Sequence, residues 1–573
     1  DLIQSVWFIL DDQKNKYVLW NVALIILLLY EVVPAFLLGK VVDFFTDYHG
    51  GNLNTFYFLA GLLGGSYVIV SFLRLTTKRH LSDIVAKTIY NVRVRGFEKL
   101  LTFSLTEHKD ENTGAKAQKI ENGTNAFQSI NSMLKAEIYV ALSTTIGVVF
   151  VFAFLSPLFI VFLLFYFLSA IMIVRLFNRK LQLLSYEKSI ATEQASGSYI
   201  EGLGNILTIK SSRAEDTFKN SISAREELTK NFRLKMNKAS INLWQSHQAL
   251  NGTSLGIFLF LIGWQVIRGE ISVGEIIIFY SYIQQLIRGT NGVVDVYSNF
   301  IDAKATFGRM MPIFFNETKN HNGSKDFPID WQGIVLQSVN FVYKKDERDE
   351  FHTGINNLDL KIEQFEKIGF AGKTGSGKST LAKLLIGLYS FDSGKYEING
   401  LNFYDIKNEE VLKNMSLVLQ ESEMFNLTLK DNITLMREFN KELFQKAISI
   451  SQLSDVIKKL PQGIETLIGE KGYYLSGGER QRVGIARAIY RDSQIMIFDE
   501  ATSSLDHRTE RFIHEALEKE LQNKTLIFVA HRVSTLKNAD KIYVFDRGRV
   551  VESGKYEELL NNQESLFYKL NTN

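Results

Sequence analysis

The sequence has no cysteine, only five prolines, and almost no excess of charge of either sign. Without cysteine, a disulfide or a thiolate-bound metal is excluded. The net charge is only +3, from 65 basic and 62 acidic residues, which does not indicate a nucleic-acid partner. The first residues lack the basic and apolar pattern of a cleavable signal peptide. The 573 residues leave room for several domains.

Long apolar runs are abundant in the first half of the chain. Six of them are long enough to cross a bilayer core of ~30 Å. They cover residues 18–38, 56–73, 139–155, 158–174, 249–267 and 271–287. The alternative for each is a buried helix of a soluble core; it is weakest for the uncharged fourth run and stronger for the fifth and sixth, which are polar in places. The sequence therefore predicts an all-α, multi-pass membrane domain with six spans.

The charges between the runs predict their orientation. The connection after the first run is short and acidic, with Asp43 and Asp47, whereas the two long connections are rich in lysine and arginine. Because positive charge marks the cytoplasmic side, we expect both termini and both long connections in the cytoplasm, beneath the inner membrane. The long connections have helical periodicity, which predicts helices that continue beyond the bilayer. Trp7 and Phe8 are predicted to anchor an N-terminal helix at the membrane surface.

The second half has the composition of a soluble α/β domain. We expect a membrane domain over 1–315, a linker over 316–333 and a nucleotide-binding domain over 334–573. The segment "EKIGFAGKTGSGKSTLAKLLIGL" has the strand, glycine loop and helix of a P-loop NTPase. Backbone N–H groups of such a loop, with the helix N-terminus, bind phosphate. The residues predicted to bind ATP here are Gly372, Thr374, Gly375, Ser376, Gly377, Lys378, Ser379 and Thr380.

Phosphoryl transfer also needs a metal site and a group that acts on water. Lys378 would neutralise the β- and γ-phosphates, and Ser379 would offer its hydroxyl to Mg²⁺. The apolar strand "SQIMIFDE" ends in Asp499, which would complete the Mg²⁺ site, and Glu500, which would orient or deprotonate the water. His531 ends another apolar strand, "TLIFVAHR". A lone histidine is more often structural, but its place at a strand end favours a sensor of the γ-phosphate.

A second glycine-rich stretch, "YYLSGGERQR" at 473–482, is too small and polar to be core. The ordered segments "GKTGSGKST", "LVLQESEMF", "YLSGGERQR", "IMIFDEATSSLD" and "AHR" resemble the nucleotide-binding domain of an ABC transporter. The six-run half resembles the membrane domain of an exporter-type half-transporter, so the resemblance covers nearly the whole chain. "TLIGEKG" is similar to the exporter X-loop, with Glu470 kept and Leu467 departing. "TIKSSRAEDTFKNS" resembles the segment around the second intracellular coupling helix.

The resemblance implies that the second glycine-rich stretch does not bind the chain's own nucleotide. Ser476, Gly477 and Gly478 would instead contact ATP held by the P-loop of a partner chain, so that two ATP molecules lie between two domains. Glu479 stands where many members have glutamine; this variant occurs within the family, and we do not interpret it as inactivating.

Three further roles are implied by the resemblance. Tyr343 would stack on adenine, although an ordinary strand aromatic is the alternative. Gln420 would sense Mg²⁺ and the attacking water and would link the site to the coupling helices. Asp506 would connect the two nucleotide sites of a dimer.

One six-span half and one ATPase domain imply a dimer as the working unit. The intact Glu500 and signature favour a homodimer, while an undamaged heterodimer subunit stays open. The leading interpretation is ATP-driven export or flipping of an amphiphilic, lipid or drug-like molecule by alternating access. The alternatives are an importer on the same fold and an ATP-gated regulatory membrane protein, which the intact Glu500 disfavours.

Polar residues at membrane depth are candidates for substrate contact. Glu31 lies in the first run and Arg288 at the inner end of the sixth. Since intramembrane charges usually face a cavity or a partner, Arg288 either binds an anionic group of the substrate or pairs with Glu31, or both residues face water. The fifth run adds Gln245, His247, Gln248 and Asn251. These side chains either line a pathway or form hydrogen bonds between helices.

Overall fold

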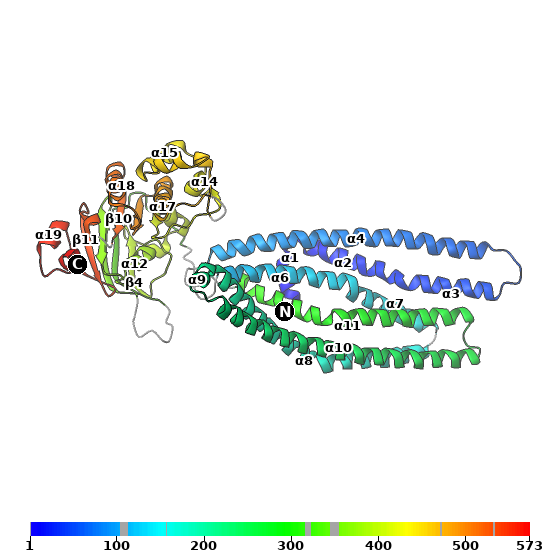
Figure 1. Ribbon diagram of the computed structural model, residues 1–573. Coiled ribbons are helices and arrows are strands. Elements are labelled where there is room, and N and C mark those ends of the chain that lie inside the picture. Colours follow the sequence, from blue (N-terminus) through cyan, green and yellow to red (C-terminus); the bar gives the residue numbers. More distant parts are fainter. Residues whose placement is uncertain are drawn as a thin grey trace. The chain divides into compact units, whose positions relative to one another are not determined.

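The computed structural model describes residues 2–103, 113–155, 157–315, 323–343, 354–469, 473–530 and 533–572. The chain forms two compact units (Figure 1). The first comprises residues 1–102 and 111–317, and its described part is helical. The second comprises residues 103–110 and 318–573 and combines helices with sheets.

Long helices build the first unit (Figure 1). They are α1 Leu2–Leu10, α2 Lys14–Leu28, α3 Val32–Thr46, α4 Asn54–Leu101, α6 Thr113–Met133, α7 Tyr139–Leu155, α8 Pro157–Gly204, α9 Ile206–Ser211, α10 Glu215–Ile267 and α11 Val273–Phe315. Short 3₁₀ turns cover Asp11–Gln13 and Leu29–Glu31, and a π-helical turn, Leu134–Ile138, joins α6 to α7. The predicted extensions of the apolar runs into long helices are confirmed, because α4, α8 and α10 have 48, 48 and 53 residues.

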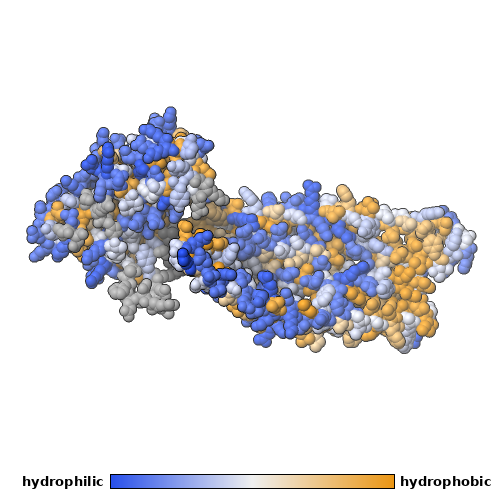
Figure 2. Space-filling model, viewed as in Figure 1, coloured by the Kyte–Doolittle hydropathy of each residue, from blue (hydrophilic) through white to orange (hydrophobic). Residues whose placement is uncertain are grey.

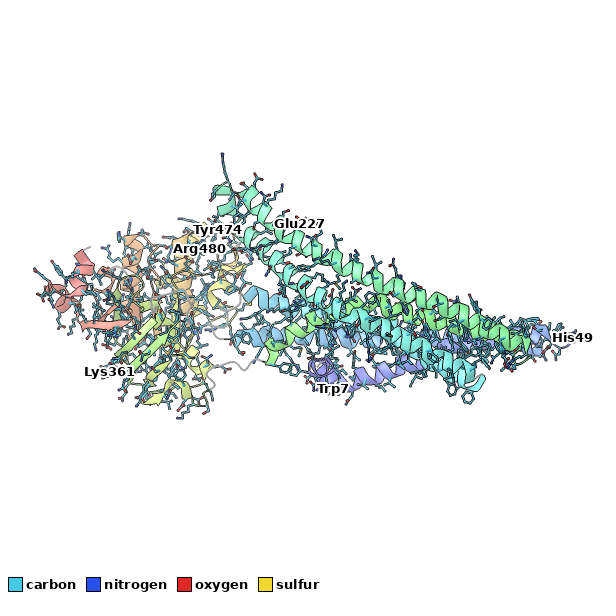
Figure 3. All side chains as sticks on the ribbon, turned by 90° about the horizontal axis from the view of Figure 1, so that it is seen from below. Trp7, His49, Glu227, Lys361, Tyr474 and Arg480 are labelled. Atoms are coloured by element: carbon cyan, nitrogen blue, oxygen red, sulfur yellow. The ribbon has the colours of Figure 1, made fainter. Side chains whose placement is uncertain are left out.

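The apolar surface of this unit is uneven. In the described part of the chain, five helical stretches are long and apolar enough to cross a membrane. The sixth predicted span forms the start of α11, which is less apolar because Glu275, Arg288 and two glutamines interrupt it. Figure 2 shows apolar side chains gathered toward the α3–α4 and α10–α11 turns. Figure 3 places His49 in the α3–α4 turn and Glu227 on the more polar part of α10.

The first long helix is interrupted at Leu29–Glu31. Pro34 has no N–H and its ring clashes with the carbonyl four residues earlier, so the chain forms a 3₁₀ turn here instead of a regular helix. Two side-chain contacts join this turn to α4. Tyr30 Oη lies 2.7 Å from Ser66 Oγ, and Arg74 Nη1 donates to Glu31 Oε1 at 2.6 Å.

Aromatic packing joins four helices of this unit. Phe152, Phe159, Phe258 and Phe279 come from α7, α8, α10 and α11, and none of them is exposed. The ring centroids of Phe159 and Phe279 are 4.5 Å apart. Tilted aromatic pairs at this distance add to the stability given by burial alone.

Two sheets form the second unit. The larger has the order β12-β11-β3-β10-β9-β6, and its neighbours pair in parallel except β11 with β12. Its strands are β3 Lys367–Gly372, β6 Met415–Val418, β9 Ile495–Asp499, β10 Thr525–Val529, β11 Lys541–Asp546 and β12 Arg549–Gly554. The smaller, antiparallel sheet has the order β2-β1-β4-β5, from Gly354–Glu363, Gly333–Val342, Ser393–Ile398 and Leu401–Asn402. A short pair joins β7 Leu427–Thr428 to β8 Leu467–Ile468.

Helices cover the larger sheet, so β9 and β10 are buried along their whole length. The helices of this unit in the described part of the chain are α12 Lys378–Leu385, α13 Asn408–Asn414, α14 Leu429–Thr434, α15 Lys441–Ile450, α16 Ser454–Lys459, α17 Gly477–Arg491, α18 His507–Glu520, α19 Tyr556–Asn561 and α20 Leu566–Thr572. The 3₁₀ turns are Phe403–Asp405, Gly463–Glu465 and Val533–Leu536. Because β3, β10 and β9 are parallel neighbours, their carboxyl ends meet at one edge of the sheet, where α/β folds bind ligands.

The described part of the expected linker, residues 323–333, is packed against the second unit. Phe327 and Trp331 are buried in its core, and Trp331 Nε1 donates to Gln494 Oε1 at 2.7 Å. Lys325 N donates to the carbonyl of Asp405 at 2.8 Å. The expectation of a linker up to residue 333 is therefore corrected, because two large apolar side chains in that segment gain stability by burial.

Candidate nucleotide site

The P-loop runs from the end of β3 into α12, as predicted. Gly372, Gly375 and Gly377 have φ angles of +148°, +80° and +106°, which side chains with a Cβ rarely adopt. A Cβ at Gly372 would lie 2.5 Å from the carbonyl oxygen of Phe545, so the loop also needs glycine for space. The loop thus has the compact backbone that lets N–H groups surround a phosphate.

Lys378 is buried at the start of α12, with 3% of its surface exposed. Its Nζ donates to the carbonyl oxygens of Gly372 and Lys373 at 2.8 and 2.9 Å. Burial lowers the pKa of Lys378, and the carboxylates of Glu500 and Asp499 only partly oppose that shift. The loop therefore holds a buried cation whose hydrogen bonds go to neutral carbonyls and not to water. Such a cation is a favourable partner for an incoming phosphate.

Ser379 and Asp499 come together as the sequence predicts. Ser379 Oγ donates to Asp499 Oδ1 at 2.7 Å, and Asp499 is 3% exposed. Mg²⁺ prefers oxygen ligands and is often bound by one or two protein groups with substrate phosphates. No group of three or more His, Cys, Asp or Glu side chains fit for a metal occurs in the described part of the chain. The Ser379–Asp499 pair fits a metal that is held jointly with nucleotide.

Glu500 and Gln420 also meet at this edge of the sheet. Gln420 Nε2 donates to Glu500 Oε2 at 2.8 Å. Glu500 has a φ of +51°, an uncommon value for a residue with a side chain, and its N donates to the carbonyl of Val529 at 3.1 Å. His531, the expected γ-phosphate sensor, lies outside the described residues.

Tyr343 lies beside the P-loop helix. Its Oη is 3.1 Å from Thr380 Oγ1, and its ring contacts Phe341 and Tyr389 at centroid distances of 4.9 and 5.5 Å. Thr374 is exposed and Ser376 is buried, with a hydroxyl that has no hydrogen-bond partner among the described residues. Adenine stacking by Tyr343 stays a prediction.

The signature stretch forms the N-terminus of α17. Ser476 is the N-cap, and Glu479 completes a capping box: Ser476 N and Oγ each donate to Glu479 Oε2 at 2.8 Å. A Cβ at Gly478 would lie 3.1 Å from the carbonyl oxygen of Ser504, so this glycine allows close packing on the loop before α18. Tyr474 and Arg480, both labelled in Figure 3, belong to this stretch, and the guanidinium carbon of Arg480 lies 5.9 Å from the centroid of the Tyr474 ring.

The structure does not join the signature to the chain's own P-loop. Among the described residues, no hydrogen bond or ion pair links Ser476, Gly477 or Gly478 to residues 372–380. Asp506 caps α18, with Oδ1 accepting from Arg508 N and Thr509 N at 3.1 and 3.0 Å. The side chain of Thr509, followed by its backbone N–H, is the main cause that lowers the pKa of Asp506.

Comparison with known families covers both units. The family described as ABC transporter matches residues 355–503, and the family described as ABC transporter transmembrane region matches residues 17–289. The chain belongs to the ABC transporter family. It combines, in one polypeptide, the family's transmembrane region with its ATPase domain.

Individual relatives agree with this assignment. The transporter is 34% identical over 328 residues to a toxin RTX-III translocation ATP-binding protein of Actinobacillus pleuropneumoniae, covering 57% of this chain and 46% of the relative. It is 35% identical over 324 residues to a leukotoxin translocation ATP-binding protein of Mannheimia glucosida, covering 56% and 45%. The match thus spans less than half the length of these relatives. A bacterial Atm1-family ABC exporter with ATP bound has the same fold, with a TM-score of 0.86, 22% identity and coverage of 97% and 98%.

The charged residues of the transporter's membrane unit are arranged differently from one of our expectations. Glu31 pairs with Arg74 of α4, not with Arg288, and the two side chains are 36% and 21% exposed. Arg288 is exposed and forms no ion pair among the described residues. The pairing of Glu31 with Arg288 is therefore wrong, because Arg74, 43 residues along the chain, reaches Glu31 across the α2–α4 contact. A substrate role for either residue stays a prediction.

The fifth span's polar residues divide between the two alternatives. Asn251 forms hydrogen bonds between helices: Tyr166 Oη donates to its Oδ1 at 2.9 Å, and its Nδ2 donates to Asn291 Oδ1 at 2.8 Å. His247 is 1% exposed, and neither ring nitrogen has a hydrogen-bond partner among the described residues. Gln245 and Gln248 are exposed.

Sequence reasoning missed Gln481. This side chain of α17 is 4% exposed and forms three hydrogen bonds to the Gln420 and Ser503–Ser504 segments. Gln481 lies within the glycine-rich stretch 473–482, but a glutamine at this position does not by itself indicate which segments it will contact. Glu510, a carboxylate only 7% exposed on α18, was missed for the same reason.

Proposed function

We propose that two copies of this chain form an ATP-driven exporter that moves an amphiphilic, lipid or drug-like substrate out of the cytoplasm, or between leaflets, by alternating access. The observation that carries the proposal is the assembly of Lys378, Ser379, Asp499, Gln420 and Glu500 at one sheet edge, in a chain that also carries the transporter membrane region. ATP hydrolysis supplies the free energy for transport.

ATP and Mg²⁺ fit the residues present. Lys378 would exchange its carbonyl acceptors for phosphate oxygens. Ser379 and Asp499 would hold Mg²⁺, which would supply neutralisation of the phosphate charge. Glu500 accepts the proton of the attacking water, and Gln420 orients that carboxylate. Tyr343 supports adenine, and His531 contacts the γ-phosphate.

Dimerisation completes each site. Ser476, Gly477 and Gly478 contact the nucleotide of the partner chain, and Asp506 lies between the two sites. Two observations support this: among the described residues no hydrogen bond or ion pair links Ser476, Gly477 or Gly478 to residues 372–380, and Ser476 and Gly477 are exposed at the N-terminus of α17. Because Glu500 and the signature are both intact, we propose a homodimer.

The exporter is placed in the inner membrane with its nucleotide-binding unit in the cytoplasm, as the charges of the connections predict. A second candidate substrate is a polypeptide, because the relatives named above are toxin translocation proteins. Membrane lipids are direct partners of the apolar helices, whose span in α4 has no buried residue.

Liposomes that carry the purified chain with its nucleotide-binding unit outward test the proposal. ATP added outside should drive a lipophilic bisbenzimide dye or a headgroup-labelled phospholipid into the lumen or inner leaflet, and a Glu500→Gln variant should not. ATP-driven movement out of the lumen would instead establish an importer. Hydrolysis with ion conductance and no movement of either probe would establish a regulatory protein.

A further inference from the structure

The side-chain amide of Gln481 is fully used in bonds to two other segments. Its Nε2 donates to the carbonyl oxygen of Gln420 at 3.1 Å and to Ser503 Oγ at 3.0 Å. Its Oε1 accepts from Ser504 N at 2.9 Å. A primary amide offers two N–H donors and one carbonyl, so all of its groups are engaged. Gln481 therefore fixes two segments that lie 61 and 22 residues away in the sequence.

These bonds close a ring that includes Glu500. Gln420 Nε2 donates to the Glu500 carboxylate at 2.8 Å, and Ser503 N donates to the Glu500 carbonyl at 3.1 Å. One path from Glu500 to Gln481 thus passes through Gln420, and the other passes through Ser503. Moving Gln481 changes the position of Glu500 through both paths.

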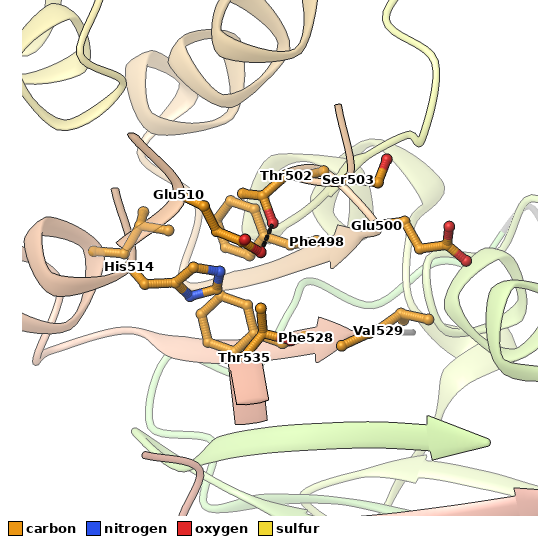
Figure 4. Close-up of a pocket in the computed structure, with 12 residues that line it drawn as sticks. Phe498, Glu500, Thr502, Ser503, Glu510, His514, Phe528, Val529 and Thr535 are labelled. Carbon is orange, nitrogen blue, oxygen red and sulfur yellow. Dashed lines mark hydrogen bonds between the residues drawn. The ribbon is translucent and has the colours of Figure 1, made fainter. Parts of the chain in front are cut away.

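The backbone of Glu500 needs such support. Its φ of +51° is unfavourable for a residue with a Cβ and persists only where the surroundings hold it. On the other side of the same loop, Thr502 Oγ1 donates to Glu510 Oε1 at 3.1 Å, with His514 and Phe528 packed behind (Figure 4). The loop after Glu500 is therefore held from α17 by Gln481 and from α18 by Glu510.

We propose that Gln481 is a positioning residue for ATP hydrolysis. It holds Gln420 and the Ser503–Ser504 backbone in the positions from which they orient Glu500. Gln481 is the fifth residue of α17, whose N-cap is Ser476. Any ligand that shifts the N-terminus of α17 shifts Gln481, and through it the carboxylate of Glu500. The N-terminus of α17 and the carboxylate of Glu500 therefore move together.

The test compares Gln481→Met with Gln494→Met in the purified full-length chain. Both changes replace a glutamine with an apolar side chain of similar length in the same unit. Gln494 directly precedes β9, at the end of that strand opposite Asp499 and Glu500, and its Oε1 accepts a hydrogen bond from Trp331. We expect kcat to fall ~10–100-fold in Gln481→Met, as for a small misplacement of a catalytic group, with the KM for ATP changed less than about twofold. Gln494→Met should have the kcat and the KM for ATP of the wild-type chain.

Ser503→Ala removes one of the three bonds and should give a smaller fall in kcat. Hydrogen exchange gives a readout independent of activity: in Gln481→Met, amides of residues 419–424 and 500–506 should exchange faster while α12 and β3 stay protected. Equal kcat in the two methionine variants, or unchanged exchange in both segments, overturns the proposal. Since the inference rests on the proposed ATPase activity, a wild-type chain that hydrolyses no ATP refutes the proposed function, and hydrogen exchange then decides the positioning role alone.

Discussion

Gln420 and Glu500 are 80 residues apart in sequence, yet Gln420 Nε2 donates a 2.8 Å hydrogen bond to Glu500 Oε2. Gln420 follows β6 and Glu500 follows β9, and these strands are parallel neighbours. The amide thus fixes the direction of the carboxylate through a bond within the protein itself. A group oriented in advance contributes to hydrolysis without a reorganisation cost at the moment of reaction.

Replacing Glu500 by glutamine should separate binding from hydrolysis. The amide still accepts the bond from Gln420 but cannot take a proton, so we expect hydrolysis to fall about 100-fold or more while ATP binding remains. Phosphate release and binding of a fluorescent ATP analogue measure the two quantities. Glu515→Gln, an exposed carboxylate on α18, is the control and should match wild type. Activity above about a tenth of wild type would assign the proton acceptor to another residue.

Lys378→Met should weaken nucleotide binding without destabilising the nucleotide-free chain. Burial lowers the pKa of Lys378, so its charged form costs folding free energy at neutral pH, and this cost declines only as the pH rises from the folded pKa toward 10.5. Methionine removes the charge and keeps the volume. We expect the Tm without nucleotide to be equal or higher, and ATP affinity to fall about tenfold or more because a charge-assisted phosphate contact is lost.

A control for this experiment is Lys395→Met, in the exposed first half of β4, where neither quantity should change. Thermal unfolding with and without ATP measures both effects in one series. A large drop in Tm for the nucleotide-free Lys378→Met chain would show that the lysine is mainly a structural cation for the loop carbonyls.

The contrast between Gln420 and Gln481 shows what the sequence could predict. Glycine spacing, a preceding strand and the order of motifs determine the P-loop, because its backbone path requires those residues. The three bonds of Gln481 have no such local signal, since they depend on where β6 and α18 lie in space. The same holds for Glu31, whose partner Arg74 follows from helix packing, and for Trp331, whose hydrogen-bond partner Gln494 lies 163 residues along the chain.

The Glu31–Arg74 pair should stabilise the membrane unit as a pair. Removing one partner leaves a charge at membrane depth, so Glu31→Gln or Arg74→Gln should each cost about 1–3 kcal/mol and lower the Tm. The double variant should recover part of that loss, because no charge is then left unpaired. Lys40→Gln, which breaks an exposed 3.5 Å pair with Asp43, should change little. Additive losses in the double variant would show that the two residues act separately.

The absence of cysteine makes the proposed dimer directly measurable by cross-linking. Thr374 in the P-loop and Tyr474, two residues before Ser476, are both exposed, so cysteines there should leave the fold intact. If the signature meets the partner's P-loop, a Thr374→Cys, Tyr474→Cys double variant carrying Glu500→Gln should be linked between chains by a short bismaleimide. The link should form with ATP and much less without it, because ATP lies between the two surfaces. Each single-cysteine variant should remain at the mass of one chain. A link confined within one chain, or one that ignores ATP, would contradict the shared site, whereas a dimer band only with ATP would place Ser476, Gly477 and Gly478 beside a partner's nucleotide.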